Sequence, residues 1–217
     1  MSQFLYRKPF FRPNSKLLNI FYANFRSVCN KVIDLNIKLE ELKIDVLLGT
    51  ETWLNTQYSN NQIIRTFQIH RRDRNSKGGG VLAAVRKGYK SLRRMEFESD
   101  IIEDIAIELI VNDIIILLIT CYIPPNNTID LSKCFEDKFK RFEIQFNQYS
   151  HVLIFGDFNV NFLPNNNGIV SKAAFDLKNI FSSFGFNQII ERYTYPTNSL
   201  SHNKKSLLDF RIQVFVI

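Results

Sequence analysis

The sequence predicts an α+β protein built from two packed β-sheets with helices on their outer faces. Three features indicate this class: strand patterns outnumber helical ones, strands and helices follow one another without strict alternation, and no glycine-rich βαβ fingerprint occurs. The chain has 217 residues, of which 45% are hydrophobic. A chain of that length buries roughly 70% of its unfolded surface, enough for one substantial core. We therefore expect one domain.

Three elements are predicted at the start of the chain. Residues 17–22 place alternate apolar side chains on one face, which is typical of a strand. From Val28 to Leu42 the apolar positions are spaced by four and three residues, which predicts one stripe of an amphipathic helix. Residues 45–51 form a short apolar run suited to a buried strand, and this run ends in a carboxylate.

The middle of the chain is predicted to be mainly β. A glycine-rich loop at 77–80 leads into an apolar strand at 81–85. Residues 105–109 alternate in polarity, and residues 114–123 are rich in β-branched side chains. Pro124 ends the second of these strands, because proline cannot donate to a sheet ladder.

The last part of the chain combines two helices with further strands. Apolar side chains from Leu131 to Phe146 recur at helical spacing. The same spacing recurs from Ala174 to Phe184, where Gly185 fits a helix C-cap. Further strands are expected at 151–157, 187–190 and 207–217.

The positive charge is concentrated in one segment. The formal net charge is +7, but residues 65–94 hold ten basic residues and one acidic residue, so that segment carries +9 and the remainder −2. A basic cluster on a slightly acidic body indicates a polyanion partner, nucleic acid first. The alternative interpretation is a solvated surface hairpin that happens to be basic.

Cysteine usage and apolar runs bear on the compartment. Cys29, Cys121 and Cys134 are an odd number without CxxC spacing, which excludes a disulfide framework and fits a reducing environment. Residues 7–9 interrupt the N-terminus before an apolar signal segment can form. The longest apolar run, 114–119, is far shorter than the roughly 20 residues of a membrane span. We expect a protein that is not secreted and does not contact the membrane.

Polar side chains stand where the apolar strands end. Strand ends at one rim of a sheet sandwich bring side chains from distant parts of the chain together on rigid supports. Three carboxylates, two amides and a phenol would form a hard-oxygen site, which suits Mg²⁺ and phosphate oxygens better than zinc. The residues in question are Asn24, Glu51, Tyr122, Asp157, Asn159 and Asp209.

Each of these residues also has a simpler interpretation. Asp157 and Asn159 could form a turn, since their side chains bond their own backbone. Glu51 could be a solvated charge at a strand end. Asp209 is harder to dismiss, because a buried carboxylate within an apolar run is costly without a partner. Their joint placement favours a site over coincidence.

Six segments together resemble a known superfamily. They cover nearly the whole chain from residue 17 to residue 210. The combination of GDFN with an upstream TETW is specific to the endonuclease/exonuclease/phosphatase superfamily, and the chain most closely resembles the apurinic-type endonuclease domain of non-LTR retrotransposons. The segments are NIFYANFRS at 19–27, DVLLGTETWL at 45–54, RRDRNSKGGGVLAAV at 71–85, TCYIPP at 120–125, LIFGDFNV at 153–160 and SLLDF at 206–210.

The resemblance implies a four-layered α/β sandwich with its active site at one rim, and phosphodiester cleavage with Mg²⁺, for which Mn²⁺ could substitute. In-line attack needs a positioned water, a cation and donors around the phosphate. By motif, Glu51 resembles the principal metal ligand, and Asn24 resembles a helper at the metal or phosphate. Tyr122 resembles the phenol at the scissile phosphate, and Asn159 resembles a phosphate-binding amide. Asp157 resembles the carboxylate that orients or deprotonates the water, and Asp209 resembles the carboxylate that orients a catalytic histidine.

The end of the chain departs from the family pattern. The pattern continues beyond the SLLDF aspartate to a further strand and a Ser-Asp-His segment, whereas this sequence ends at Ile217 without another histidine. We therefore expect an extension at 1–16 and an endonuclease-like domain at 17–217 that lacks the last strand. The chain is then either a fragment of a longer polyprotein, with a reverse transcriptase domain as partner, or a truncated copy.

The leading hypothesis is a Mg²⁺-dependent DNA endonuclease that nicks one strand of its target, monomeric and placed in the nucleus or cytoplasm by its substrate. One alternative is an inactive remnant that at most binds nucleic acid, because a lost general acid–base group costs on the order of 10²–10⁴-fold in rate. Another is a phosphatase or lipid phosphodiesterase of the same superfamily. In the leading hypothesis the DNA backbone is held by Arg71, Arg72, Arg74 and Lys77.

Overall fold

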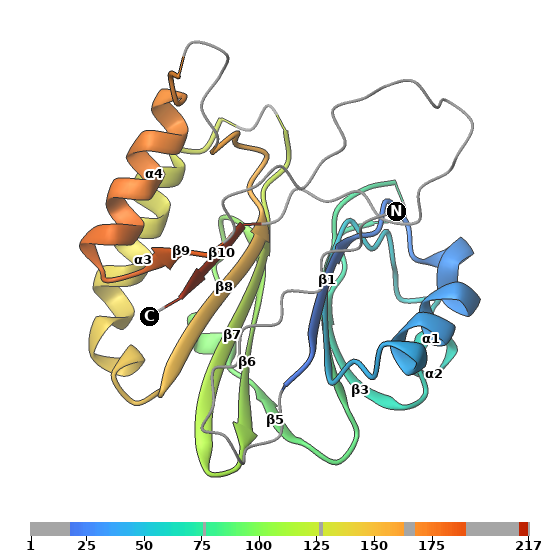
Figure 1. Cartoon of the computed structure of the whole chain (residues 1–217). Coiled ribbons are helices and arrows are strands. Elements are labelled where there is room, and N and C mark those ends of the chain that lie inside the picture. Colours follow the sequence, from blue (N-terminus) through green and yellow to red (C-terminus); the bar gives the residue numbers. More distant parts are fainter. Residues whose placement is uncertain (1–17, 76, 126–127, 163–167, 190–212, 217) are drawn as a thin grey trace.

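Two β-sheets pack face to face and carry helices on their outer faces, which gives four layers (Figure 1). The computed structural model describes residues 18–75, 77–125, 128–162, 168–189 and 213–216. The order of the strands and helices in these residues confirms the predicted α+β sandwich of two mixed sheets flanked by helices. No helix in these ranges is long and apolar enough to cross a bilayer.

The first sheet has four strands. β1 is parallel to β2, and the other neighbours are antiparallel. The 3₁₀ turn η1 (Cys29–Lys31), α1 (Val32–Glu41) and α2 (Asn60–Ile63) lie on its outer side (Figure 1). In spatial order the strands are β1 (Ile20–Asn24), β2 (Val46–Thr50), β4 (Val81–Arg86) and β3 (Phe67–Arg72).

The second sheet has six strands. β7 and β8 are parallel, and the other pairs are antiparallel. The 3₁₀ turn η2 (Met95–Phe97) follows β5, while α3 (Leu131–Phe146) and α4 (Lys172–Ser183) cover the outer face (Figure 1). In spatial order the strands are β5 (Lys90–Arg93), β6 (Glu103–Val111), β7 (Ile114–Tyr122), β8 (His151–Asp157), β10 (Gln213–Val216) and β9 (Asn187–Gln188).

Within the described residues the expected elements are present, one helix is shortened, and four short elements are added. The helix expected at 28–42 starts as η1 and becomes α-helical only at Val32. β3, β5, α2 and η2 were not anticipated, because β3 and β5 are half-exposed edge strands rich in polar side chains rather than apolar runs. Residues 17, 190, 207–212 and 217 of the expected strands lie outside the described residues, and the described part of the last strand is β10.

Central strands are buried on both faces, and their period-two alternation divides the core. In β7, Ile116 and Leu118 face the first sheet, whereas Leu117 and Ile119 face the helices. The inter-sheet cluster continues in β2, where Val46 and Leu48 point inward. A third cluster lies between the first sheet and α1.

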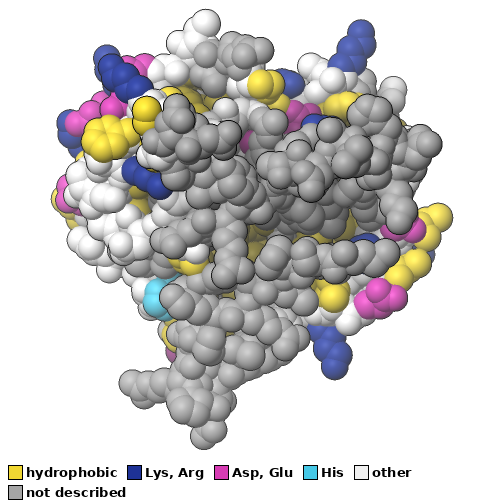
Figure 2. Space-filling model, turned by 45° about the horizontal axis from the view of Figure 1, so that its top comes forward, with side chains coloured by type: hydrophobic (Ala, Val, Ile, Leu, Met, Phe, Trp, Pro, Cys, Tyr) yellow, Lys and Arg dark blue, Asp and Glu magenta, His cyan; other side chains and the backbone are white. Residues whose placement is uncertain are grey.

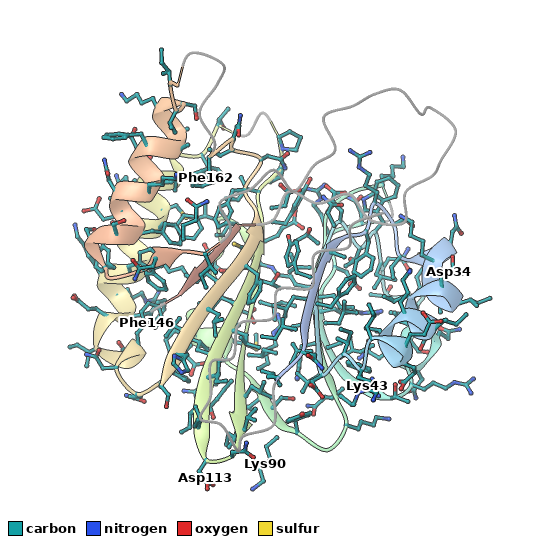
Figure 3. The ribbon with its side chains drawn as sticks, in the orientation of Figure 1. Asp34, Lys43, Lys90, Asp113, Phe146 and Phe162 are labelled. Atoms are coloured by element: carbon teal, nitrogen blue, oxygen red, sulfur yellow. The ribbon has the colours of Figure 1, made fainter. Side chains whose placement is uncertain are left out.

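Aromatic side chains fill the layer between the second sheet and its helices. Asp130 and Ser171 cap α3 and α4 by accepting hydrogen bonds from backbone N–H groups three residues on. Figure 3 shows Phe146 and Phe162 between these helices and the sheet. The rings of Phe139 and Phe186 are stacked with centroids 4.8 Å apart. This layer fixes β8, and with it the strand end that bears Asp157.

A buried ion pair ties α3 to the sheets. The Asp104 carboxylate on β6 is fully buried and pairs with the ammonium group of Lys138 on α3, which is also buried. Arg72 of β3, in the other sheet, lies 3.5 Å from the same carboxylate, and the Ser99 N–H donates to it at 2.8 Å. Burial raises the pKa of Asp104, while Lys138 opposes that rise.

Removing the ammonium partner should destabilise the fold. We expect Lys138→Met to lower the free energy of unfolding in urea by about 3 kcal/mol, at the lower end for a broken buried pair because Arg72 and Ser99 still contact Asp104. Lys140→Met, which removes an exposed partner of Glu136 on the same helix, should cost under about 1 kcal/mol.

The loss of unfolding free energy in Lys138→Met should depend on pH. A carboxyl whose pKa is raised by folding stabilises the native state most below its unfolded pKa, and that contribution is lost as pH rises through the folded pKa. Lys138→Met removes a group that lowers this pKa, so the deficit should be smaller at about pH 5 than at about pH 8. A deficit independent of pH would rule out Asp104 as its source.

Candidate active site

The carboxyl ends of the parallel pairs β1–β2 and β7–β8 meet at one rim of the sandwich. There they enclose a pocket of about 450 Å³. Five of the six strand-end residues singled out in the sequence line it, and Asp209 lies outside the described residues. The pocket is lined by Asn24, Arg26, Glu51, Trp53, Tyr122, Pro125, Asp157 and Asn159.

A hydrogen bond between the two sheets holds the centre of the pocket. The Asn24 amide Nδ2 donates to Asp157 Oδ2 at 2.8 Å, and both side chains are buried. Asn24 Oδ1 accepts from the Arg26 backbone N–H at 3.2 Å, and Asp157 Oδ1 accepts from the Asn159 N–H at 3.1 Å. Both side chains are therefore fixed in orientation before any ligand binds.

The Glu51 carboxylate lies on the other side of the pocket, just after β2. Its Oε2 accepts from the Trp53 indole N–H and from the Gly79 backbone N–H, the latter at 3.3 Å. Glu51 and Trp53 both have left-handed backbone, with φ of 53° and 55°. Such non-glycine conformations are costly and persist only where the surroundings impose them.

The Tyr122 phenol pairs with Glu51 and stays protonated. Tyr122 ends β7 directly beside Asp157 in the parallel register, and its hydroxyl hydrogen-bonds to Glu51. Burial raises the pKa of Tyr122 well above its ordinary value, and the negative charges of Glu51 and Asp157 raise it further. Tyr122 is thus a hydrogen-bond donor at neutral pH.

The triple-glycine loop is held by Glu103. Glu103 Oε2 accepts from the Gly80 N–H at 2.6 Å, and its Oε1 pairs with Arg74 at 2.8 Å. The Arg74 guanidinium lies 5.9 Å from the centroid of the Tyr122 ring, which brings it to the pocket edge. At Gly79, with φ of 68°, a side chain would be strained, and its Cβ would lie 2.5 Å from that guanidinium unless Arg74 moved, so glycine is favoured.

The four predicted nucleic-acid-binding residues fall into two pairs, of which one is covered by contacts within the protein and the other is exposed. Arg71 is largely covered, since it donates to the Asn55 and Tyr58 carbonyls and pairs with Asp73. Arg72 is bound to Asp104 and to the Ser99 carbonyl. Arg74 and Lys77 are exposed near the pocket.

Much of the charge of segment 65–94 is compensated by acidic residues from elsewhere. Arg86 pairs with Glu40, Arg93 with Glu98, and Arg94 with Glu108. On the face shown in Figure 2, the described Lys and Arg side chains lie among Asp and Glu side chains rather than in one patch. The basic surface is therefore narrower than the charge count of the segment indicates.

Three pocket residues were not singled out in the sequence: Arg26, Trp53 and Pro125. A signal for the first two is present. Arg26, Trp53 and Asn159 each follow a pocket residue by two positions, and each has positive φ, of 43°, 55° and 48°. The spacing of two residues thus places Arg26 and Trp53 on the same pocket, although the backbone there is left-handed rather than extended.

The donor set fits a hard cation. The described residues contain no cluster of three or more His, Cys, Asp or Glu side chains. The pocket instead offers the carboxylates of Glu51 and Asp157 with two amides and a phenol. Mg²⁺ is ordinarily bound by one or two carboxylates, with water and substrate phosphates completing its shell. The residues present therefore suit Mg²⁺ or Mn²⁺.

The sequence pattern of the Endonuclease/Exonuclease/phosphatase family matches residues 17–210, and the chain belongs to that family. No curated protein matches the chain by sequence.

Solved structures share the fold at low identity. The endonuclease domain of TRAS1, a telomere-specific non-LTR retrotransposon, is 13% identical over 90% of this chain and 83% of that one, with a TM-score of 0.66. An AP endonuclease from Archaeoglobus fulgidus is 16% identical over 92% and 86%, with a TM-score of 0.59. D. rerio TDP2 complexed with single strand DNA product is 14% identical over 92% and 83%, with a TM-score of 0.58.

The protonated state of Tyr122 can be measured directly. In an ultraviolet difference titration of the chain against Tyr122→Phe, we expect no Tyr122 ionisation in the range where ordinary tyrosines ionise, near pH 10. Glu51→Gln removes one of the charges that raise this pKa, so in that background the ionisation should begin at lower pH. Ionisation of Tyr122 at its ordinary pH in the unmodified chain would contradict the burial and the contact with Glu51.

Proposed function

We propose that the protein is a Mg²⁺-dependent DNA endonuclease of the non-LTR retrotransposon type, which hydrolyses one phosphodiester and nicks one strand. The observation that carries this proposal is the pair of carboxylates, Glu51 and Asp157, supplied by different sheets to one pocket. Around them lie donors suited to a phosphate. The fold shared with the TRAS1 endonuclease domain and with an AP endonuclease supports a nucleic-acid phosphodiester as substrate.

In this mechanism Glu51 and Asn24 would hold the cation. When bound, the cation supplies Lewis-acid stabilisation of the charge that develops on the phosphate oxygens. The Glu51 carboxylate accepts a hydrogen bond from the Gly79 backbone N–H at 3.3 Å, which limits the reorganisation that binding requires.

Asp157 would orient the attacking water and accept its proton. Its carboxylate is held by Asn24 and by the Asn159 N–H, which leaves few orientations open to it. Positioning of this kind reduces the entropic part of the barrier. By family resemblance Asp209 would orient a histidine partner, and this residue lies outside the described residues.

Tyr122 and Asn159 would donate to the phosphate. Tyr122 keeps its proton, so its hydroxyl can donate to a phosphate oxygen. Because the phenol is neutral, it adds no negative charge beside the Glu51 and Asp157 carboxylates. Asn159 is fixed by its Nδ2, which donates to the Ile123 carbonyl at 2.7 Å. These two residues flank Asp157 along the rim.

DNA would approach over Arg74 and Lys77. Both are exposed beside the glycine-rich loop, and contacts of this type hold the phosphate backbone without reading sequence. Arg71 and Arg72 would instead support this edge from beneath through their backbone and ion-pair contacts.

Nicking of supercoiled plasmid tests the reaction. We expect conversion to open circle with Mg²⁺, none with EDTA, and a loss on the order of 10²–10⁴-fold in Asp157→Asn. Asp113→Asn, at the β6–β7 turn on the opposite end of the sheet (Figure 3), is the matched control and should keep full activity. A chain that is folded yet nicks no plasmid in Mg²⁺ or Mn²⁺ would contradict the proposal.

The salt dependence of DNA binding tests the proposed path. Because each phosphate contact contributes about −0.9 to the slope of log K against log salt, Arg74→Ala/Lys77→Ala should make that slope shallower by about two. Lys87→Ala/Lys90→Ala removes the same charge from exposed positions at the far end of the sheets, where Figure 3 shows Lys90. Equal effects of the two double substitutions would indicate net charge rather than a local contact.

A further inference from the structure

Trp53 has a contact that the reaction outlined above does not require of it. We propose that Trp53 is a positioning residue for the cation-binding carboxylate: its indole N–H occupies Glu51 Oε2, so that the other carboxylate oxygen is presented to the cation. This inference rests on the proposed role of Glu51 as a cation ligand.

Oε2 of Glu51 accepts hydrogen bonds from two donors. A carboxylate oxygen has two lone-pair sites, and here they meet the Trp53 indole N–H and the Gly79 backbone N–H. The Tyr122 hydroxyl also contacts this carboxylate, but a phenol at a rotatable side-chain end can exchange that contact for a phosphate oxygen. The Gly79 backbone amide has no such freedom.

Backbone hydrogen bonds hold the segment that carries the indole. The Trp53 N–H donates to the Gly79 carbonyl at 3.0 Å, and the Thr52 N–H donates to the Gly80 carbonyl at 3.3 Å. Thr52 and Leu54 are fully buried, so the alternation of side chains sends Glu51 and Trp53 to the pocket side. The two positive φ angles in three residues are maintained by this pairing with the glycine loop.

A packing role alone would need the ring but not its N–H. Trp53 is half-buried at the pocket wall, and phenylalanine would fill most of the same space. The hydrogen bond is what distinguishes indole from phenyl. Partners that orient a metal-binding carboxylate typically contribute about 10–100-fold in metal affinity.

The experiment measures Mn²⁺ binding to the full chain by electron paramagnetic resonance, without any turnover. We expect Trp53→Phe to weaken Mn²⁺ binding about 10-fold, and Trp53→His, which retains a ring N–H, to recover part of that loss. The matched control is Tyr149→Phe, which removes a 3.1 Å hydrogen bond from an aromatic side chain to Glu108 before the start of β8, away from the pocket. That variant should bind Mn²⁺ as the unmodified chain does.

A second readout uses the unmodified protein. Trp53 is the single tryptophan of the chain, so its fluorescence reports the indole directly. Mg²⁺ should change its emission with the midpoint found by calorimetry, and the change should be absent in Glu51→Gln.

The outcomes separate the two proposals. Equal Mn²⁺ affinity in the chain and in Trp53→Phe, or emission that does not respond to a cation that binds, would overturn the positioning role and leave the proposed function standing. A folded chain that binds neither Mn²⁺ nor Mg²⁺ would overturn the proposed function and this inference with it.

Discussion

The hydrogen bond from Asn24 to Asp157 joins the two sheets at the point where the pocket forms. Its partners are 133 residues apart in the sequence and end strands of different sheets. The inter-sheet core determines whether these strand ends meet, because the packing of Leu48 and Leu118 sets the distance between the sheets. A polar link in a buried place is stable only when both partners are satisfied, as they are here. The pocket is thus a consequence of core packing as much as of its own side chains.

The rim of the sandwich departs from regular backbone where the site lies. Of the described non-glycine residues with positive φ, Arg26, Glu51, Trp53 and Asn159 line the pocket. Each such residue costs of order 1–3 kcal/mol. Hydrogen bonds between residues 52–53 and 79–80 offset part of that cost and continue the pairing of β2 with β4 beyond the regular strands. The aromatic layer under α3 and α4 and the Asp104–Lys138 pair stabilise the second sheet on its other side.

The sequence was informative where local pattern and tertiary burial agree. Alternation in β6, β-branched side chains in β7 and helical spacing in α3 identified those elements, and the polar residues after buried strands identified five pocket residues. Edge strands such as β3 were missed because one face is solvated and the apolar run is short. The counted charge of segment 65–94 overstated the basic surface, because acids such as Glu40 and Glu108 come from other elements. Trp53 could have been found only by extending the period of two past Glu51, where a turn is the usual expectation.

We propose that Glu51 holds a cation in the pocket that it shares with Asp157. The most direct measurement is anomalous diffraction from crystals of the chain soaked in Mn²⁺. We expect a peak in the pocket within coordination distance of the Glu51 carboxylate, about 2 Å, on the side away from the Trp53 indole and facing Asp157. A peak elsewhere, or a Glu51 carboxylate that binds the cation through Oε2 after releasing Trp53, would contradict this assignment.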